Sequence, residues 1–199
     1  MSVQIPLVPE IELELAEECV GLFDATGGYR SDTPPPFWRF AWPGGMALAR
    51  FVLDFPHIVR QKRIVDLGSG SGIVAIAAAM AGARQVVAVD TDPAARAAAV
   101  RNAALNRVEV ETGAEPVPGD VVLAGDVFYS PAVAPAVLKL LRGTEAYVGD
   151  PGRGFLPERL FEAVAVYDVP VRRALEDGDV MRTTVWRLAT SRAASAAGP

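Results

Sequence analysis

A glycine-rich turn preceded by an acid is the first feature of the sequence whose residue types and spacing could do chemistry. Residues 63–72 read RIVDLGSGSG, which predicts a short buried strand and then a turn containing Gly68, Ser69, Gly70 and Gly72. An apolar run follows and predicts a helix. A helix N-terminus offers free backbone N–H groups, and glycine lets a ligand approach the backbone closely. The pattern therefore predicts a small-molecule site, although such a turn can also do no more than bend a strand into a helix.

Two acidic residues narrow the chemistry of that ligand. Asp66 stands just before the first glycine, where a carboxylate would repel a pyrophosphate and attract an ammonium group. Asp90 and Thr91 end the next predicted strand, the place from which an acid accepts hydrogen bonds from ribose hydroxyls in dinucleotide folds. S-adenosylmethionine carries both an ammonium group and a ribose, so it fits this pair. A nicotinamide-dependent dehydrogenase would share the glycine turn and Asp90, but Asp66 and the lack of a Tyr-x-x-x-Lys pair argue against it.

Alternating strands and helices must position these residues. After the turn we expect a helix ended by Gly82 and the strand at 85–90. Further elements are expected in this order: a helix at 93–106, strands at 108–111 and 120–124, a helix at 131–142, a strand at 146–150, a helix running into an extended segment at 156–168, and a strand at 179–188. Such alternation predicts a single α/β domain over 1–199, Rossmann-like, with a mostly parallel, twisted sheet and helices on both faces.

The two ends of the chain are expected to lie outside this core. Residues 1–36 predict an extension in which 10–23 form an amphipathic helix and the glycines and prolines of 26–36 form a loop. A segment rich in aromatic residues then precedes a helix whose apolar stripe includes Met46, Ala49 and Leu53. The small and polar residues at 190–199 predict a flexible tail.

Composition limits the classes of function. The chain of 199 residues has a net charge of −5 and scattered arginines, which argues against a nucleic-acid partner. Its start has no secretion signal, no apolar run is long enough to span a membrane, and Cys19 is the only cysteine. We therefore expect a cytoplasmic protein with no membrane partner. No cluster of Cys and His has metal-ligand spacing, so no metal is expected. The oligomeric state is left open.

Several motifs together carry a family resemblance. VDLGSGSG at 65–72, with VVAVD after it, resembles the first motif and the acidic loop of class I, seven-strand S-adenosylmethionine-dependent methyltransferases. PFWRFAWPGG before the first of these strands, GDVFY at 125–129, GDPGR at 149–153 and TTVW at 183–186 resemble, in the same order, the lysine methyltransferases that modify the β subunit of electron-transfer flavoprotein. The resemblance implies a protein substrate, the flavoprotein β subunit. Ribosomal-protein methyltransferases share the early motifs, so a ribosomal protein stays an alternative acceptor.

The same resemblance implies a D/E-x-x-F/Y motif on the acceptor side, carried by Asp126 and Tyr129. A carboxylate can orient a substrate amine while an aromatic face attracts its cationic form. Alternatively, Asp126 caps the next helix along the chain and Tyr129 only packs. Trp42 is expected to cover the methyl donor or to line a passage for lysine, although loop aromatics such as Trp38, Phe40 and Trp42 often only close the core.

Other interpretations also stay open at this point. Asp150 and Arg153 of GDPGR could shape the substrate entrance or simply belong to a turn. A small amine would need the same donor site with a different pocket. A module that binds S-adenosylmethionine without turnover is a further alternative, and the presence of both Asp126 and Tyr129 argues against it.

Overall fold

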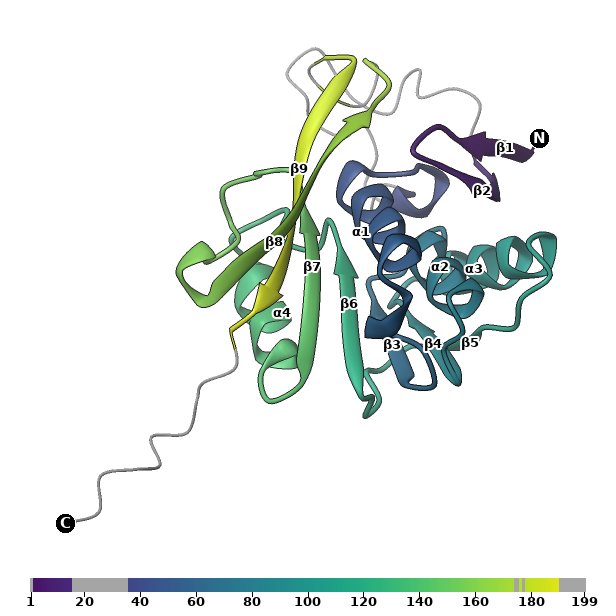
Figure 1. Ribbon diagram of the computed structural model, residues 1–199, viewed down its shortest axis with the longest axis horizontal. Coiled ribbons are helices and arrows are strands. Elements are labelled where there is room, and N and C mark those ends of the chain that lie inside the picture. Colours follow the sequence, from purple (N-terminus) through teal and green to yellow (C-terminus); the bar gives the residue numbers. More distant parts are fainter. Residues whose placement is uncertain (1, 16–35, 174–175, 177, 190–199) are drawn as a thin grey trace.

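A seven-stranded sheet forms the centre of the molecule. The computed structural model describes residues 2–15, 36–173, 176 and 178–189. The strands lie in the order β5-β4-β3-β6-β7-β9-β8 (Figure 1). Their bounds are β3 Arg63–Leu67, β4 Gln85–Val89, β5 Glu111–Gly113, β6 Val121–Gly125, β7 Glu145–Asp150, β8 Phe161–Pro170 and β9 Val180–Leu188. β3 to β7 are parallel, while β9 runs antiparallel to both β7 and β8. The predicted mostly parallel sheet is confirmed.

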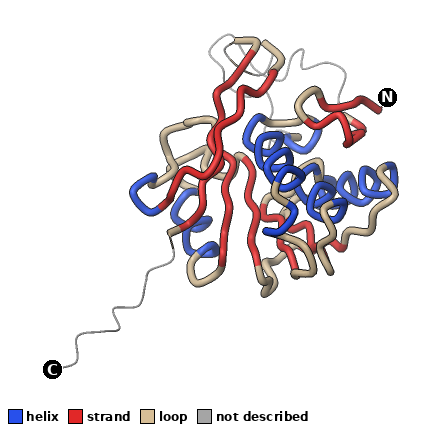
Figure 2. The backbone as a smooth tube through the Cα atoms, viewed as in Figure 1, coloured by secondary structure: helices blue, strands red, loops and turns tan. Residues whose placement is uncertain are grey.

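Helices cover both faces of this sheet. They are α1 Pro43–Asp54, α2 Ile73–Met80, α3 Pro93–Leu105 and α4 Ala134–Leu141. On one face, side chains such as Ile64 and Leu123 pack in a cluster with the buried residues of α1, α2 and α3. On the other face, Val65 and Val122 pack with Val137 and Leu141 of α4. Alternate residues of the buried strands thus point into two cores, as parallel strands between helical layers require; Figure 2 shows the strand layer and its helices.

The prediction of a helix beginning at residue 10 is wrong over the described residues. Two strands, β1 Ser2–Ile5 and β2 Val8–Glu14, form an antiparallel hairpin beside the helices (Figure 1). In β2, Ile11 and Leu13 are buried, whereas Glu12 and Glu14 are not. This period of two is typical of a strand with one buried face, and it outweighs the helical spacing read over a longer window. The remainder of that helix, residues 26–35 of the loop predicted at 26–36 and the tail at 190–199 lie outside the described residues.

Two further elements differ from the prediction. The helix expected from residue 156 is only the 3₁₀ turn Glu158–Leu160, after which β8 begins at Phe161. Pairing of Phe161 with Leu188 of β9 extends the chain there, so tertiary pairing overrides local helix propensity. The strand expected at 108–111 lies at 111–113 instead, paired with Val87–Val89 of β4.

Candidate active site

The glycine turn between β3 and α2 has the backbone that its sequence predicts. Gly68, Gly70 and Gly72 have φ values of 69°, 52° and 84°, in the left-handed region that favours glycine. The Gly68 N–H donates to the Val89 carbonyl oxygen at 2.8 Å, which ties the turn to the end of β4. The turn therefore lies at the carboxyl edge of the parallel strands, where open α/β sheets bind ligands.

Asp90 lies directly against this turn. Its Oδ2 accepts a hydrogen bond from the Gly70 N–H at 3.0 Å, and its Oδ1 accepts one from the Asp92 N–H at 2.9 Å. Arg96 donates to the carbonyl oxygens of Asp90 and Thr91, and the Thr91 side chain is exposed. The structure thus brings the second-strand acid and the glycine turn into direct contact.

Asp66 is almost completely buried beneath the turn. Its Oδ2 accepts from the Ala75 N–H of α2 at 3.0 Å. Burial raises the pKa of Asp66 to about 7; the Ala75 hydrogen bond opposes the rise and the negative charge of Asp90 adds to it. A cation beside this carboxylate would favour its ionised form.

One polar atom of the turn lacks a partner. Among the described residues, Ser69 Oγ is buried and makes no hydrogen bond. An unpaired buried hydroxyl is costly unless a ligand or water satisfies it. With the left-handed glycines and the neighbouring carboxylates of Asp66 and Asp90, this hydroxyl fits a site for the polar part of S-adenosylmethionine.

Asp126, at the end of β6, is held by donors on both carboxylate oxygens. Its Oδ2 accepts from the N–H groups of Gly44 and Gly45, the latter at 3.1 Å. Its Oδ1 accepts from Nε and Nη2 of Arg153 at 3.1 and 3.0 Å. Asp126 therefore caps the N-terminus of α1, a helix distant in sequence, and not the helix that follows it. Each oxygen already accepts two hydrogen bonds, which uses the ordinary capacity of a carboxylate.

The backbone and the charge of Asp126 are both constrained by their surroundings. Its φ of 55° is in the left-handed region, and its N–H donates to the Gly149 carbonyl oxygen at 2.9 Å. Burial raises the pKa of Asp126 to about 6, and the Arg153 guanidinium and the amides of Gly44 and Gly45 limit that rise.

Three glycines allow α1 to approach the strands this closely. A Cβ added to Gly44 would overlap the Gly149 carbonyl oxygen and the Asp126 carboxylate. A Cβ on Gly149 would overlap the Gly44 carbonyl oxygen, and one on Gly125 would lie 2.6 Å from the Gly45 Cα. The start of α1 therefore sits directly on the ends of β6 and β7. Its first N–H groups are used by Asp126 and are not left for a ligand.

Arg153 joins this arrangement to two other segments. Its Nη2 lies 2.6 Å from Glu176 Oε1, in the connection between β8 and β9. Its guanidinium carbon lies 5.7 Å from the ring centroid of Trp42, a cation–π distance. Asp150 makes a local turn instead, because its Oδ1 accepts from the Gly152 N–H at 2.7 Å. Of the two GDPGR residues whose role was open, Arg153 is the one that contacts Asp126.

Aromatic side chains connect the segment before α1 to Tyr129, which follows β6. Phe37 lies 5.9 Å from Trp42 and 5.8 Å from Tyr129, measured between ring centroids. The Trp42 Nε1–H donates to the Phe37 carbonyl oxygen at 2.8 Å. Burial raises the pKa of Tyr129, and the negative charge of Asp90 adds to that rise. Because its side chain is half-exposed, Tyr129 is accessible to a substrate in a way that Asp126 is not.

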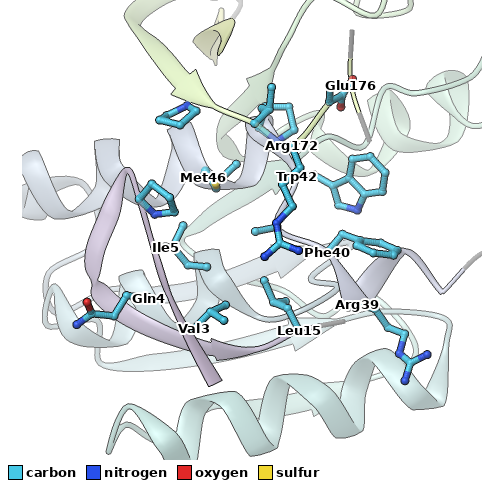
Figure 3. A pocket seen from close by; sticks show the side chains of 15 residues that line it. Val3, Gln4, Ile5, Leu15, Arg39, Phe40, Trp42, Met46, Arg172 and Glu176 are labelled. Carbon is cyan, nitrogen blue, oxygen red and sulfur yellow. The ribbon is translucent and has the colours of Figure 1, made fainter. Parts of the chain in front are cut away.

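A cavity of about 190 Å³ adjoins this cluster, between the β1–β2 hairpin, the start of α1 and the end of β8 (Figure 3). Trp42 and Glu176, which both contact Arg153, also line the cavity. Phe40 and Met46 contribute apolar surface.

The sequence did not reveal two of these positions. Glu176 lies in no motif and is 50 residues from Asp126, to which Arg153 links it. Asn102 of α3 is fully buried and connects β2 to the glycine turn: its Oδ1 accepts from the Glu14 N–H at 2.8 Å and its Nδ2 donates to the Ser71 carbonyl oxygen at 2.8 Å. The only signal in the sequence was a polar residue among the alanines of α3.

The fold and the glycine turn define a class I methyltransferase architecture, and comparison with known proteins agrees. The family model of ribosomal protein L11 methyltransferase (PrmA) matches residues 51–155. Electron transfer flavoprotein beta subunit lysine methyltransferase of Homo sapiens is 35% identical over 201 residues, covering 90% of this chain and 75% of that protein. The Xenopus laevis protein of that name is 36% identical, with 91% and 80% covered.

Solved structures support the same fold. A Thermoplasma acidophilum protein superposes with a TM-score of 0.58 at 18% identity, covering 74% of this chain and 90% of that chain. Ribosomal protein L11 methylase from Lactobacillus delbrueckii gives 0.50 at 21% identity, with 71% and 78% covered.

The protein is thus an S-adenosylmethionine-dependent methyltransferase. It belongs to the family that contains the electron transfer flavoprotein beta subunit lysine methyltransferases. No helix within the described ranges is long and apolar enough to cross a membrane.

Proposed function

We propose that the protein transfers a methyl group to a lysine amine of the β subunit of electron-transfer flavoprotein. The main observation behind this proposal is that relatives named for this activity align over about nine tenths of the chain, and the human protein is 35% identical to it. The similarity therefore extends beyond the donor site. The residues on the acceptor side, an acid and several aromatic rings, suit a cationic side chain that is apolar along its length.

The donor half of the site holds S-adenosylmethionine in this proposal. Asp90 and Thr91 lie on the ribose side and Asp66 on the ammonium side. The turn formed by Gly68, Ser69, Gly70 and Gly72 supplies backbone N–H groups and the Ser69 hydroxyl, and Trp42 borders the site from the acceptor side. When bound, the donor supplies a methyl group bonded to a positively charged sulfonium sulfur. The sulfur is already a good leaving group, because it departs as a neutral thioether.

The protein's own residues must align the acceptor and exclude water. The amine attacks through its lone pair, so it has to release its proton to solvent before the transfer. Tyr129 and Trp42 form the walls beside which the lysine chain lies. Asp126 was expected to hold the amine, and that contact stays a prediction. Because four N–H donors already use its oxygens, we propose that Asp126 acts mainly through its charge and by fixing the start of α1.

The experiment is a transfer assay with purified flavoprotein and labelled S-adenosylmethionine, followed by mass spectrometry to locate the methyl group. Asp126→Asn keeps the shape and removes the charge, so turnover should fall at least about tenfold, the scale of a lost hydrogen bond to a charged group. Affinity for the donor, measured by calorimetry, should persist. Tyr129→Phe should have a smaller effect if the ring face matters more than the hydroxyl.

Two matched variants control for general damage to the protein. Asp120 lies just before β6, at the opposite edge from Asp126, and accepts from the Arg63 N–H. Tyr167 lies on β8, and its hydroxyl donates to Asp54. Asp120→Asn and Tyr167→Phe should keep wild-type turnover. If Asp126→Asn retained full turnover, the assignment of Asp126 would be rejected.

A ribosomal protein is the second candidate acceptor. Ribosomal protein L11 methyltransferase of Geobacter sulfurreducens is 54% identical over 70 residues, but that match covers only 33% of this chain. The same assay should therefore include ribosomal protein L11 and small amines. Transfer confined to either would reject the flavoprotein substrate and leave the methyltransferase activity intact. Donor binding with no transfer to any acceptor would favour a module without turnover.

A further inference from the structure

Arg153 stands where four parts of the acceptor side meet. It contacts Asp126 after β6, Glu176 between β8 and β9, and the ring of Trp42 before α1, while its own segment follows β7. The side chains of Asp126 and Glu176 are only 9% and 8% exposed, and that of Arg153 is 23% exposed. The cluster is therefore a largely buried network and not a surface ion pair.

The charges in this network depend on one another. Two carboxylates share a single guanidinium, and the N-terminal N–H groups of α1 supply the remaining positive potential at Asp126. Removing one partner of a buried ion pair leaves the other uncompensated, which is strongly unfavourable. Without Arg153, both Asp126 and Glu176 would lose the guanidinium with which they pair.

We propose that Arg153 is a positioning residue for methyl transfer: it holds Asp126 against the start of α1 and fixes Trp42 and Glu176 beside it, so that the acceptor amine is aligned. The proposal rests on the proposed lysine methylation and deepens it. Arg153 acts through Asp126 and Trp42 and is not assigned a contact with the reacting atoms.

The same geometry allows an opposite role for Arg153, in which it occupies the place of the substrate amine. The experiment must distinguish this role from positioning. An aromatic ring with two carboxylates is also the chemistry that binds a lysine ammonium. If Arg153 merely occupied the place of the substrate amine, removing it would improve binding of the protein substrate. If it positions the site, removing it would lower kcat instead.

The experiment compares Arg153→Met, Arg153→Lys and a matched control in the holoenzyme loaded with S-adenosylmethionine. Arg173→Met is the control, because Arg173 forms an exposed ion pair with Asp179 in the same β8–β9 connection that contains Glu176. We expect Arg153→Met to lower kcat about 10- to 100-fold, the scale of lost hydrogen bonds between charged groups. KM for the protein substrate should not fall, the donor Kd should change less than twofold, Arg153→Lys should recover part of kcat, and Arg173→Met should match the wild type.

A second measurement needs no substrate. Because Asp126 accepts from the N–H groups of Gly44 and Gly45, hydrogen exchange of these two amides reports on the network directly. Exchange should be faster in Arg153→Met and intermediate in Arg153→Lys. Unchanged exchange, or a lower KM with undiminished kcat, would overturn the proposal. If the wild type does not methylate the flavoprotein, the proposed acceptor fails, and the exchange result still decides whether Arg153 holds the network.

Discussion

The proposed donor half and the proposed acceptor half of the active site are built in opposite ways. The donor half comes from one β3–α2–β4 unit, in which Asp66 and Asp90 are 24 residues apart and a single turn joins strand to helix. The acceptor half collects Gly44, Asp126, Arg153 and Glu176 from four separate segments. Local connectivity is enough to position the first group. The second depends on how α1 packs on the ends of β6 and β7 and on the pairing of β9 with β7.

A substitution at Gly44 should break the acceptor half with the largest effect. In Gly44→Ala the new Cβ would overlap backbone and the Asp126 carboxylate, so α1 would have to shift. We expect the protein to lose about 3 kcal/mol of unfolding free energy, at the upper end for overpacking, together with most of its turnover. Denaturant unfolding and the transfer assay measure the two effects.

Gly45→Ala is the control for this variant. Its Cβ would lie 3.4 Å from Ile73 Cγ2, an ordinary contact, and the N–H to Asp126 is retained. Alanine also favours helix over glycine by about 1 kcal/mol. Equal stability of the two alanine variants would show that the close approach of α1 is unimportant.

A substitution at Asp90 should damage the donor half alone. Asp90→Ala removes the predicted acceptor for the ribose and the partner of the Gly70 N–H. Donor binding should weaken by roughly 1 to 3 kcal/mol, the scale for polar partners left unpaired. Calorimetry with the demethylated donor measures this change. Asp126→Asn, whose acid lies in the other half, should bind the donor as the wild type does. Unchanged affinity in a folded Asp90→Ala would reject the assignment of Asp90.

The pH dependence of folding stability should also distinguish the two halves of the site, with a smaller effect than the substitutions above. The folded pKa of Asp66, about 7, is well above the ordinary value for aspartate. A raised pKa means that the folded state binds the proton more tightly. The folding stability that comes from this tighter proton binding is therefore fully present below about pH 4, the ordinary pKa of aspartate. It is lost as pH rises to about 7. Between pH 5 and 7, wild-type protein without donor should lose on the order of 1 kcal/mol per pH unit relative to Asp66→Asn.

Thermal unfolding of both proteins across this pH range measures the difference. Saturating donor should reduce it, because a neighbouring ammonium favours the ionised form of Asp66. Parallel pH profiles for wild type and Asp66→Asn would contradict the burial of this carboxyl group. Asp126→Asn provides a reference from the acceptor half, since the pKa of Asp126 is raised only to about 6.

The sequence by itself determined the fold class and the local structure of the proposed donor half. Apolar strands, a helix and a glycine turn follow one another in residues 63–90, and each can be identified from a local pattern. The left-handed φ values at Gly68, Gly70 and Gly72 and the contact of Asp90 with Gly70 follow from that order, because parallel strands bring their carboxyl ends to one edge.

Only the tertiary structure decided the N-terminal hairpin, the extended start of β8 and the partners of Asp126. The sequence could name Asp126, Tyr129 and Trp42 through a family resemblance, but it could not show that Asp126 accepts from Gly44 and Arg153. Those contacts join residues that are 82 and 27 positions apart, and no local propensity encodes such pairs. They exist because three glycines permit α1 to sit on the strand ends and because the buried charges must be compensated there.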